Sequence, residues 1–238
     1  MLVIIGLIIG GIMIGRTLIR AAEIKSIRTD IEKFEAARLA FRSKYNCVPG
    51  DCSSATTLGL GNNGNGDGYV GHYTSGSEHW NFWVHLGNAG LIAGTYSGTN
   101  GPNSGGGGSI DAVIGFNIPG SRIPGVGYSL YTPAPGWTTF SAALGLGLDR
   151  SVTDTAYLIG GDSPSNQYNT LDGFLSPVDV KSIDDKYDDG LANDGNVRVA
   201  FGSATYKTNG CTSGANPNYS YASTDGTLCN LQYWFRNF

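Results

Sequence analysis

The feature that most constrains this chain is its first 45 residues, which follow one continuous helical pattern. Residues 1–15 read MLVIIGLIIGGIMIG and carry no charge. Between Arg16 and Tyr45 there is no Gly or Pro, so we expect a single helix about 67 Å long. Its later part has an apolar stripe at helical spacing, interrupted by Arg38 and formed by Ile24, Ile27, Ile31, Phe34, Phe41 and Tyr45.

The two parts of this helix need different surroundings. Residues 24–46 can pack their apolar stripe on a globular head, which we assign to residues 47–238. Residues 1–23 begin with a segment that is apolar on all sides and must lie in lipid or among similar helices. The pairs Gly6/Gly10 and Gly11/Gly15 have the spacing that allows helices to approach closely. A plain membrane anchor and the apolar part of a signal peptide are the alternatives.

The four cysteines form two local pairs. Cys47 and Cys52 flank a Pro-Gly turn, and Cys211 and Cys229 bracket a polar loop near the C-terminus. This pattern favours two disulfides over buried free thiols, and disulfides indicate a head outside the cytoplasm.

The charge pattern excludes one class of partner. The net charge is −4, which argues against nucleic-acid binding, since that requires a basic face. The charges are also unevenly placed: eight of the 15 Lys and Arg lie within residues 16–44, whereas residues 179–194 contain six Asp and two Lys. The acidic segment therefore needs a positive partner or open solvent.

The N-terminus resembles the type IV pilin and type II secretion pseudopilin superfamily. The matching residues are LVIIGLIIGG at 2–11, the amphipathic continuation to Tyr45, and Pro49-Gly50-Asp51. Segments 64–68, 83–94 and 184–197 are similar to one large-headed prepilin group. The resemblance implies an α+β fold in which a long N-terminal helix packs on an antiparallel β-sheet head with short helices and long Gly-rich loops.

The resemblance also implies a structural role and no enzymatic one. The chain would be a pilin that polymerises through its N-terminal helix into an extracellular filament on a bacterial surface. Before assembly it would lie in the inner membrane, with the assembly machinery as a partner. The residues expected in the helical filament core are Leu2, Ile5, Leu7, Ile8, Ile9, Ile12 and Ile14.

One position departs from the family pattern. Mature pilins have a Glu at their fifth position, where this chain has Ile5. The pattern fits a family chain lacking its first eight or so residues, or a subunit that assembles without that Glu. Two other functions stay open: a minor pseudopilin of a type II secretion system, and a membrane-anchored adhesin or binding domain that does not polymerise.

The head is expected to contain two short helices and several strands. A Ser75-x-x-Glu78 cap predicts a helix to Ala89, and Ser176-Pro177 begins a helix to Asp189 that stops at Gly190. Strand-like runs occupy residues 112–116, 126–131, 156–159, 197–201 and 231–235.

Two segments carry oxygen ligands suited to calcium. Asn63, Asn65 and Asp67 reproduce the front of a calcium loop, although an ordinary Asn/Gly turn has the same composition. The acidic segment around the end of the second helix offers a second set of carboxylates. The alternatives to calcium there are the basic stretch 16–44 of a neighbouring subunit and plain solvation. The set consists of Asp184, Asp185, Asp188, Asp189 and Asp194. His72, His79 and His85 cluster in sequence without a known zinc spacing.

Overall fold

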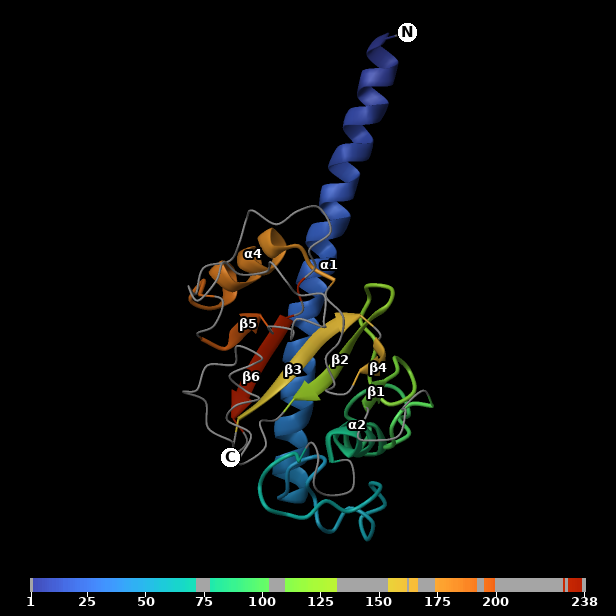
Figure 1. Cartoon of the computed structure of the whole chain (residues 1–238), viewed down its shortest axis with the longest axis vertical. Coiled ribbons are helices and arrows are strands. Elements are labelled where there is room, and N and C mark those ends of the chain that lie inside the picture. Colours follow the sequence, from blue (N-terminus) through green and yellow to red (C-terminus); the bar gives the residue numbers. More distant parts are fainter. Residues whose placement is uncertain are drawn as a thin grey trace.

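The first helix dominates the molecule. The computed structural model describes residues 2–71, 78–102, 110–131, 154–161, 163–166, 174–191, 195–199, 229 and 231–236. Helix α1 (Leu2–Tyr45) runs unbroken through both of its expected halves, and its N-terminal part projects away from the head (Figure 1). The prediction of one continuous helix is confirmed.

The head contains a four-stranded antiparallel sheet in the order β2-β3-β6-β5. Its strands are β2 (Val126–Tyr131), β3 (Asp154–Gly161), β6 (Leu231–Arg236) and β5 (Val197–Val199). Side chains alternate between the two faces of a strand, so Tyr157 and Ile159 of β3 share a face with Tyr233 and Leu231, their partners on β6. The sheet order places β3 and β6 at the centre.

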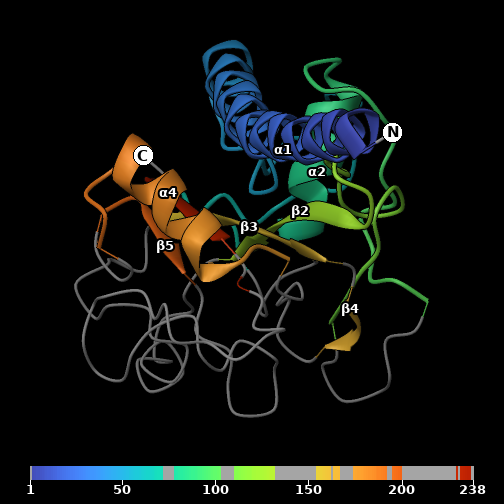
Figure 2. The ribbon, with the colours of Figure 1, turned by 90° about the horizontal axis from the view of Figure 1, so that it is seen from above.

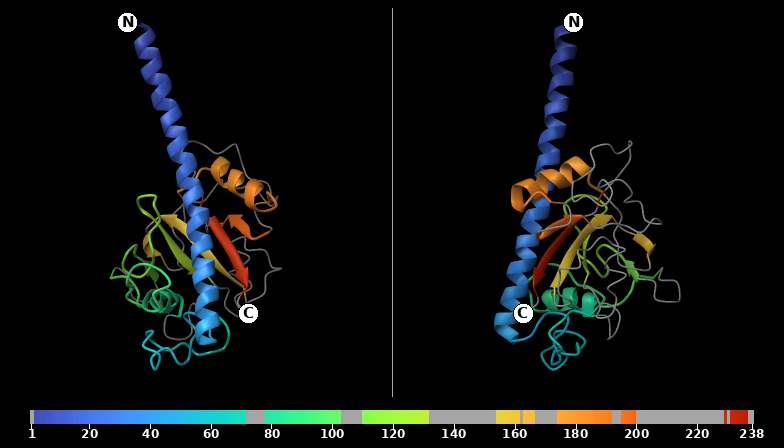
Figure 3. Two further views of the ribbon diagram at one scale, coloured as in Figure 1. Left: turned by 180° about the vertical axis from the view of Figure 1, so that it is seen from behind. Right: turned by 60° about the vertical axis from the view of Figure 1, so that its left-hand side comes forward.

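The C-terminal half of α1 covers one face of this sheet (Figure 3). Phe34 meets Tyr128 of β2 edge-on at 5.0 Å between ring centroids, and lies 6.0 Å from Tyr157 of β3. Arg38, which interrupts the apolar stripe in the sequence, is buried: its guanidinium bonds Glu35 at 2.9 Å and lies over the Phe235 ring. The stripe and this arginine together form the helix side of the core.

Two short helices lie beside α1: Figure 2 shows α2 on the α1 side of the sheet, and Figure 1 shows α4 beyond the β5 end of the sheet, near the point where α1 leaves the head. Helix α2 (Glu78–Asn88) is buried along most of its length, and Trp83 meets Phe34 edge-on at 5.0 Å. Helix α4 (Pro177–Tyr187) begins at Ser176, whose hydroxyl accepts a hydrogen bond from the backbone N–H of Asp179. It ends two residues earlier than expected, and Gly190 then adopts a φ of 75°.

One predicted strand is wrong. The apolar run 112–116 was expected to be extended, but the strand β1 (Ile110–Ala112) stops where that run begins and pairs with β4 (Ser163–Asn166). Residues 113–118 instead fold into a tight turn, in which the Asn117 side chain accepts a hydrogen bond from the N–H of Val113. Gly115, at a φ of 79°, makes this turn possible.

The described elements are compatible with the expected α+β class: a long N-terminal helix, antiparallel strands and short helices. The division into residues 1–23, 24–46 and 47–238 stays a prediction. The expected cap residue Ser75 and Gly-rich loop 105–108 lie outside the described residues.

Candidate functional site

The N-terminal half of α1 is an apolar helical surface that the rest of the described chain does not cover. Its large side chains are 53–76% exposed, and they are Val3, Ile4, Ile5, Leu7, Ile8, Ile9, Ile12, Met13, Ile14, Leu18 and Ile19. The helix is long and apolar enough to span a membrane or to act as a signal sequence. This surface needs a covering by lipid or protein.

The glycines of this half face open space. A Cβ atom added at Gly6, Gly10, Gly11 or Gly15 would meet no other atom within 4 Å. Each Gly weakens a helix by ~1 kcal/mol relative to Ala. Contacts within the described chain therefore give no reason for these four positions to lack a side chain.

The C-terminal half is tied to the head by polar contacts as well as by its apolar stripe. The hydroxyl of Tyr128 donates to Asp30 at 3.0 Å, and the hydroxyl of Tyr157 donates to Glu35 at 2.9 Å. Burial, together with the nearby carboxylates, raises the pKa of both tyrosines well above its ordinary value. The two phenols therefore stay protonated and keep donating these bonds.

Further up the helix, Arg20 joins α1 to the start of α4. Its guanidinium lies 2.8 Å from Asp179, and both side chains are partly exposed. This pair connects the basic helix to the start of the acidic segment within one chain, and a contact of the later carboxylates with another subunit stays a prediction.

A disulfide turn follows the last residue of α1. Cys47 and Cys52 are bonded, as predicted, and the backbone N–H of Gly50 donates to Nδ1 of His85 at 2.8 Å. The other ring nitrogen of His85 lies 2.8 Å from the carbonyl oxygen of Asn62. Burial lowers the pKa of His85, which favours the neutral ring that accepts the Gly50 hydrogen bond.

These contacts also bear on the zinc hypothesis. Both ring nitrogens of His85 have backbone partners, so the residue is arranged as a structural clamp. His79 packs against Trp80 in α2, with 4.2 Å between ring centroids, and His72 lies outside the described residues. No histidine of the described ranges belongs to a potential metal-binding group.

The second disulfide was expected between Cys211 and Cys229. Cys229 is buried and disulfide-bonded, and its backbone exchanges hydrogen bonds with Leu175 just before α4. Cys211 lies outside the described residues.

The predicted calcium loop at Asn63, Asn65 and Asp67 is organised around Asp51. Its carboxylate accepts hydrogen bonds from the backbone N–H groups of Gly66, Asp67 and Gly68 at 2.6–3.2 Å. The Asn63 side chain accepts from the N–H of Thr56, and the Asn65 amide donates to Asp67. These ligand side chains are engaged by the chain itself, which favours the Asn/Gly turn.

Glu78 supports the same turn from α2. Its two carboxylate oxygens accept from the N–H groups of Asn65 and Gly71, at 2.8 and 2.6 Å. Burial raises the pKa of both Asp51 and Glu78, while the backbone donors oppose that shift. The sequence pattern assigns Glu78 to a helix cap. It does not show that Asp51 and Glu78 hold this turn, because the backbone groups that they bind lie many residues away in the chain.

The acidic turn after α4 brings three carboxylates together. Oxygens of Asp184, Asp188 and Asp189 lie within 4.8 Å of one another and could hold a metal ion. Asp185 is separate, since it pairs with Lys181 at 2.6 Å. Asp194 lies outside the described residues.

The loop after α4 is built onto the same carboxylates. The backbone N–H groups of Asn196 and Val197 donate to Asp188, and the N–H of Leu191 donates to Asp189. The turn is therefore held by its own backbone donors.

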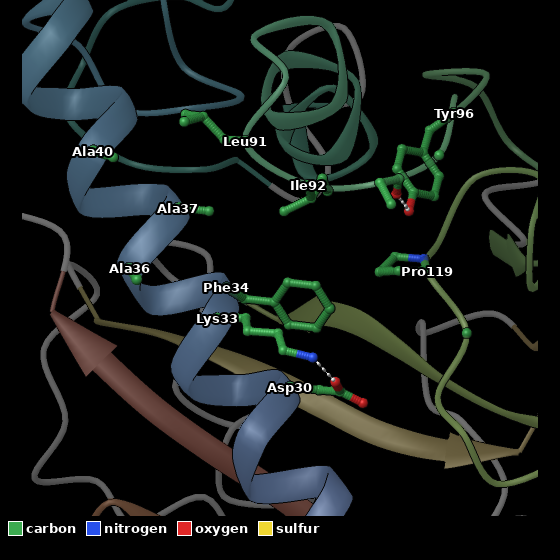
Figure 4. A pocket seen from close by; sticks show the side chains of 13 residues that line it. Asp30, Lys33, Phe34, Ala36, Ala37, Ala40, Leu91, Ile92, Tyr96 and Pro119 are labelled. Carbon is green, nitrogen blue, oxygen red and sulfur yellow. Dashed lines mark hydrogen bonds and ion pairs between the residues drawn. The ribbon is translucent and has the colours of Figure 1, made fainter.

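A groove of about 760 Å³ opens between α1 and the segment after α2 (Figure 4). The helix supplies a floor of small side chains, Ala36, Ala37 and Ala40, and Leu91 and Ile92 form the facing wall. No local pattern in the sequence indicates this groove, because its two walls are about 50 residues apart in the chain.

Compared with protein-family models, with curated proteins and with solved structures, the chain shows no significant match. A long apolar N-terminal helix, a disulfide at Cys47–Cys52 and an α+β layout are compatible with a pilin-like protein.

Proposed function

We propose that this chain is a pilin, a structural subunit that polymerises through the N-terminal half of α1 into an extracellular type IV pilus-like filament. Before assembly, this half would hold the chain in the inner membrane, where the assembly machinery would extract it. The chain's partners would then be its own copies.

One observation carries the proposal. The apolar half of α1 continues without a break into a half that is fixed to the head by buried side chains. A flexible anchor needs no such rigid connection. A subunit that places its head at a fixed position on a filament does need one, because the helix then sets the orientation of the head.

The glycines support assembly over simple anchoring. A lipid-facing helix gains nothing from four positions without a side chain, whereas neighbouring helices can approach closely at small residues. The family resemblance of residues 2–11 and 49–51 points in the same direction.

The test is electron microscopy of material sheared from cells that express the full chain. Wild type and Ile8→Leu, which keeps the apolar surface, should form filaments. Ile8→Asp should abolish them, because a charge among packed apolar helices is strongly unfavourable. Its head should still melt at the wild-type temperature in detergent.

Two results would contradict the proposal. Filaments that persist in Ile8→Asp would show that another surface drives assembly. Wild-type protein that stays in the membrane and displays a folded head without filaments would support the anchored binding domain instead.

For the acidic turn we propose calcium as the bound ion, since carboxylate and carbonyl oxygens are its ordinary ligands. Calcium should raise the melting temperature of the wild-type chain, and the rise should grow with the logarithm of the free calcium concentration once that exceeds the dissociation constant. Asp189→Asn should reduce that rise, and Asp185→Asn should not, because Asp185 lies outside the cluster. Equal rises in both variants, or none in wild type, would count against an ion here.

A further inference from the structure

Helix α4 is the described element at the end of the head from which α1 projects (Figures 1 and 3). Its first turn is joined to α1 through Asp179, whose carboxylate lies 2.8 Å from the guanidinium of Arg20. Val178, the residue before Asp179, is 57% exposed. The first turn of α4 is therefore held at the level of Arg20 and presents an aliphatic side chain to its surroundings.

The sequence of α1 fixes where a bilayer around its apolar half would end. The exposed apolar side chains extend to Leu18 and Ile19. The first charged side chains along the chain are those of Arg16 and Arg20. A bilayer that covers Leu18 and Ile19 has its headgroups near Arg20, because arginine stays charged and hydrocarbon excludes charge. The first turn of α4 then lies at the level of the headgroups as well, since Asp179 binds Arg20.

Arg16 lies one helical turn nearer the N-terminus than Arg20 and on the same side of α1. A long arginine side chain at such a place can extend its guanidinium to the headgroups. Arg20 is already bonded to Glu23 and Asp179. No ion pair of the described residues includes Arg16. Arg16 is therefore suited to bind a lipid phosphate, the planar anion that a guanidinium recognises through two hydrogen bonds.

The two ends of α4 differ in charge. Near its start, Asp179 is balanced by Arg20, and one turn further on Lys181 pairs with Asp185. At its far end, the acidic turn gathers three carboxylates within 4.8 Å of one another. A lipid surface with anionic headgroups would thus accept the balanced start of α4 and repel the acidic turn.

We propose that, before assembly, the first turn of α4 rests on the lipid surface of the membrane, with Val178 among the headgroups and Arg16 bound to a phospholipid phosphate beside it. The inference rests on the membrane stage of the proposed function and adds which face of the head meets the bilayer. The contact gives the head a second attachment to the membrane besides α1, so the head keeps one orientation there. Extraction of the subunit into a filament has to break this contact.

Photo-crosslinking of the full chain in vesicles tests the contact. The vesicles contain phosphatidylethanolamine and phosphatidylglycerol, in buffer without calcium so that the acidic turn keeps its charge. A diazirine analogue of leucine replaces one exposed aliphatic residue at a time: Val178, Leu191 after the far end of α4, Leu58 beyond the C-terminal end of α1, or Ile8 as a control for insertion. We expect phospholipid adducts from positions 8 and 178, and several-fold fewer from positions 191 and 58.

A charge variant tests the part assigned to Arg16. Arg16→Gln should lower the yield of lipid adducts from position 178 several-fold, because it removes the phosphate contact beside the first turn of α4. Lys25→Gln is the matched control, since Lys25 also lies outside the ion pairs of the described residues but on the other side of α1. It should leave the yield unchanged. If Arg16→Gln and wild type give equal yields, Arg16 binds no phosphate at this contact and that part of the inference is wrong.

The outcomes separate this inference from the proposed function. Equal yields from positions 178 and 191, or none from position 178 although position 8 reacts with lipid, would overturn the contact of α4 and leave the membrane stage intact. No lipid adduct from position 8 would overturn the membrane stage and this inference with it. Lipid adducts from position 178 in a chain that never forms filaments would support the contact and count against polymerisation alone.

Discussion

The two halves of α1 share one backbone and differ in almost everything that surrounds it. In residues 24–45 the apolar stripe is buried, and Asp30, Glu35 and Arg38 each have a partner in the head or on the helix. In residues 3–19 the large apolar side chains are more than half exposed and the glycines touch nothing. The helix passes from one environment to the other without a kink-forming residue.

The two halves therefore differ in what stabilises them. The buried half is stabilised by its own head, through apolar burial and hydrogen bonds. The exposed half has its helical hydrogen bonds but gains no apolar burial from the described head. Substitutions in the two halves should therefore affect different measurements.

The largest expected effect on stability lies in the buried half. Phe34→Ala removes a ring that contacts Trp83, Tyr128 and Tyr157, and should lower the free energy of unfolding by about 3–5 kcal/mol. Ile8→Ala, the matched truncation in the exposed half, should leave it unchanged. Denaturant unfolding of the full chain in detergent measures both. Equal decreases in the free energy of unfolding for the two variants would show that the two halves do not differ in what stabilises them.

A smaller loss is expected from one phenol. Tyr157→Phe removes the hydroxyl that donates to Glu35 and should lower the free energy of unfolding by about 1–3 kcal/mol. Because Arg38 still pairs with Glu35, the loss should stay below that of Phe34→Ala. If Tyr157→Phe instead lowers the yield of filaments and leaves the free energy of unfolding unchanged, the contact serves assembly and not the stability of the head.

Acidification should destabilise the contacts of His85 with the turn that follows α1. The unfolded chain protonates His85 near its ordinary pKa of 6.5, whereas burial lowers that pKa in the folded head. The unfolded state therefore binds the proton first, and stability should fall as pH drops below about 6.5. Asp51 and Glu78 act oppositely at lower pH, since the folded head takes up their protons first.

Melting temperatures of wild type and His85→Gln between about pH 8 and about pH 5.5 measure this effect. The variant should lose the pH dependence that belongs to His85. An unchanged profile would show that the Gly50 hydrogen bond does not depend on the charge of this ring.

The smallest effect should come from the boundary between the halves. Arg20→Ala breaks the pair with Asp179, and since both side chains are partly exposed the loss should be about 0–1 kcal/mol. Lys25→Ala, which no ion pair of the described residues includes, should cost less. If Arg20→Ala lowers the free energy of unfolding by more than about 2 kcal/mol, far beyond the ~1 kcal/mol of exposed pairs, then the tightly packed part of α1 reaches further toward the N-terminus than described here.

Local patterns in the sequence were sufficient for the helices and for most described strands. The unbroken run from Arg16 to Tyr45, the Ser176-Pro177 start and the stretch 126–131 each carry their own signal, and the structure confirms them. The run 112–116 is misleading, because most of it forms a turn held by the Asn117 side chain, and such side-chain hydrogen bonds leave no mark in residue spacing.

The candidate sites show more clearly what local sequence patterns cannot predict. Asp51, Glu78 and His85 bind backbone groups 7–35 residues away, and such pairings depend on tertiary structure. In the sequence Arg38 interrupts the apolar stripe, although Glu35 and Phe235 make it part of the core. The acidic turn was visible as a run of charge, but only the fold separates Asp185 from the other three carboxylates.

The attachments between α1 and the head also have a mechanical consequence. They are spread along the helix, at Arg20, Asp30, Glu35 and the disulfide turn after Tyr45. Tension applied along the helix axis loads them in parallel, as shear, so no single contact bears the whole force. A sideways pull would open them one after another, beginning at Arg20. The head is thus arranged to resist stretching far better than peeling.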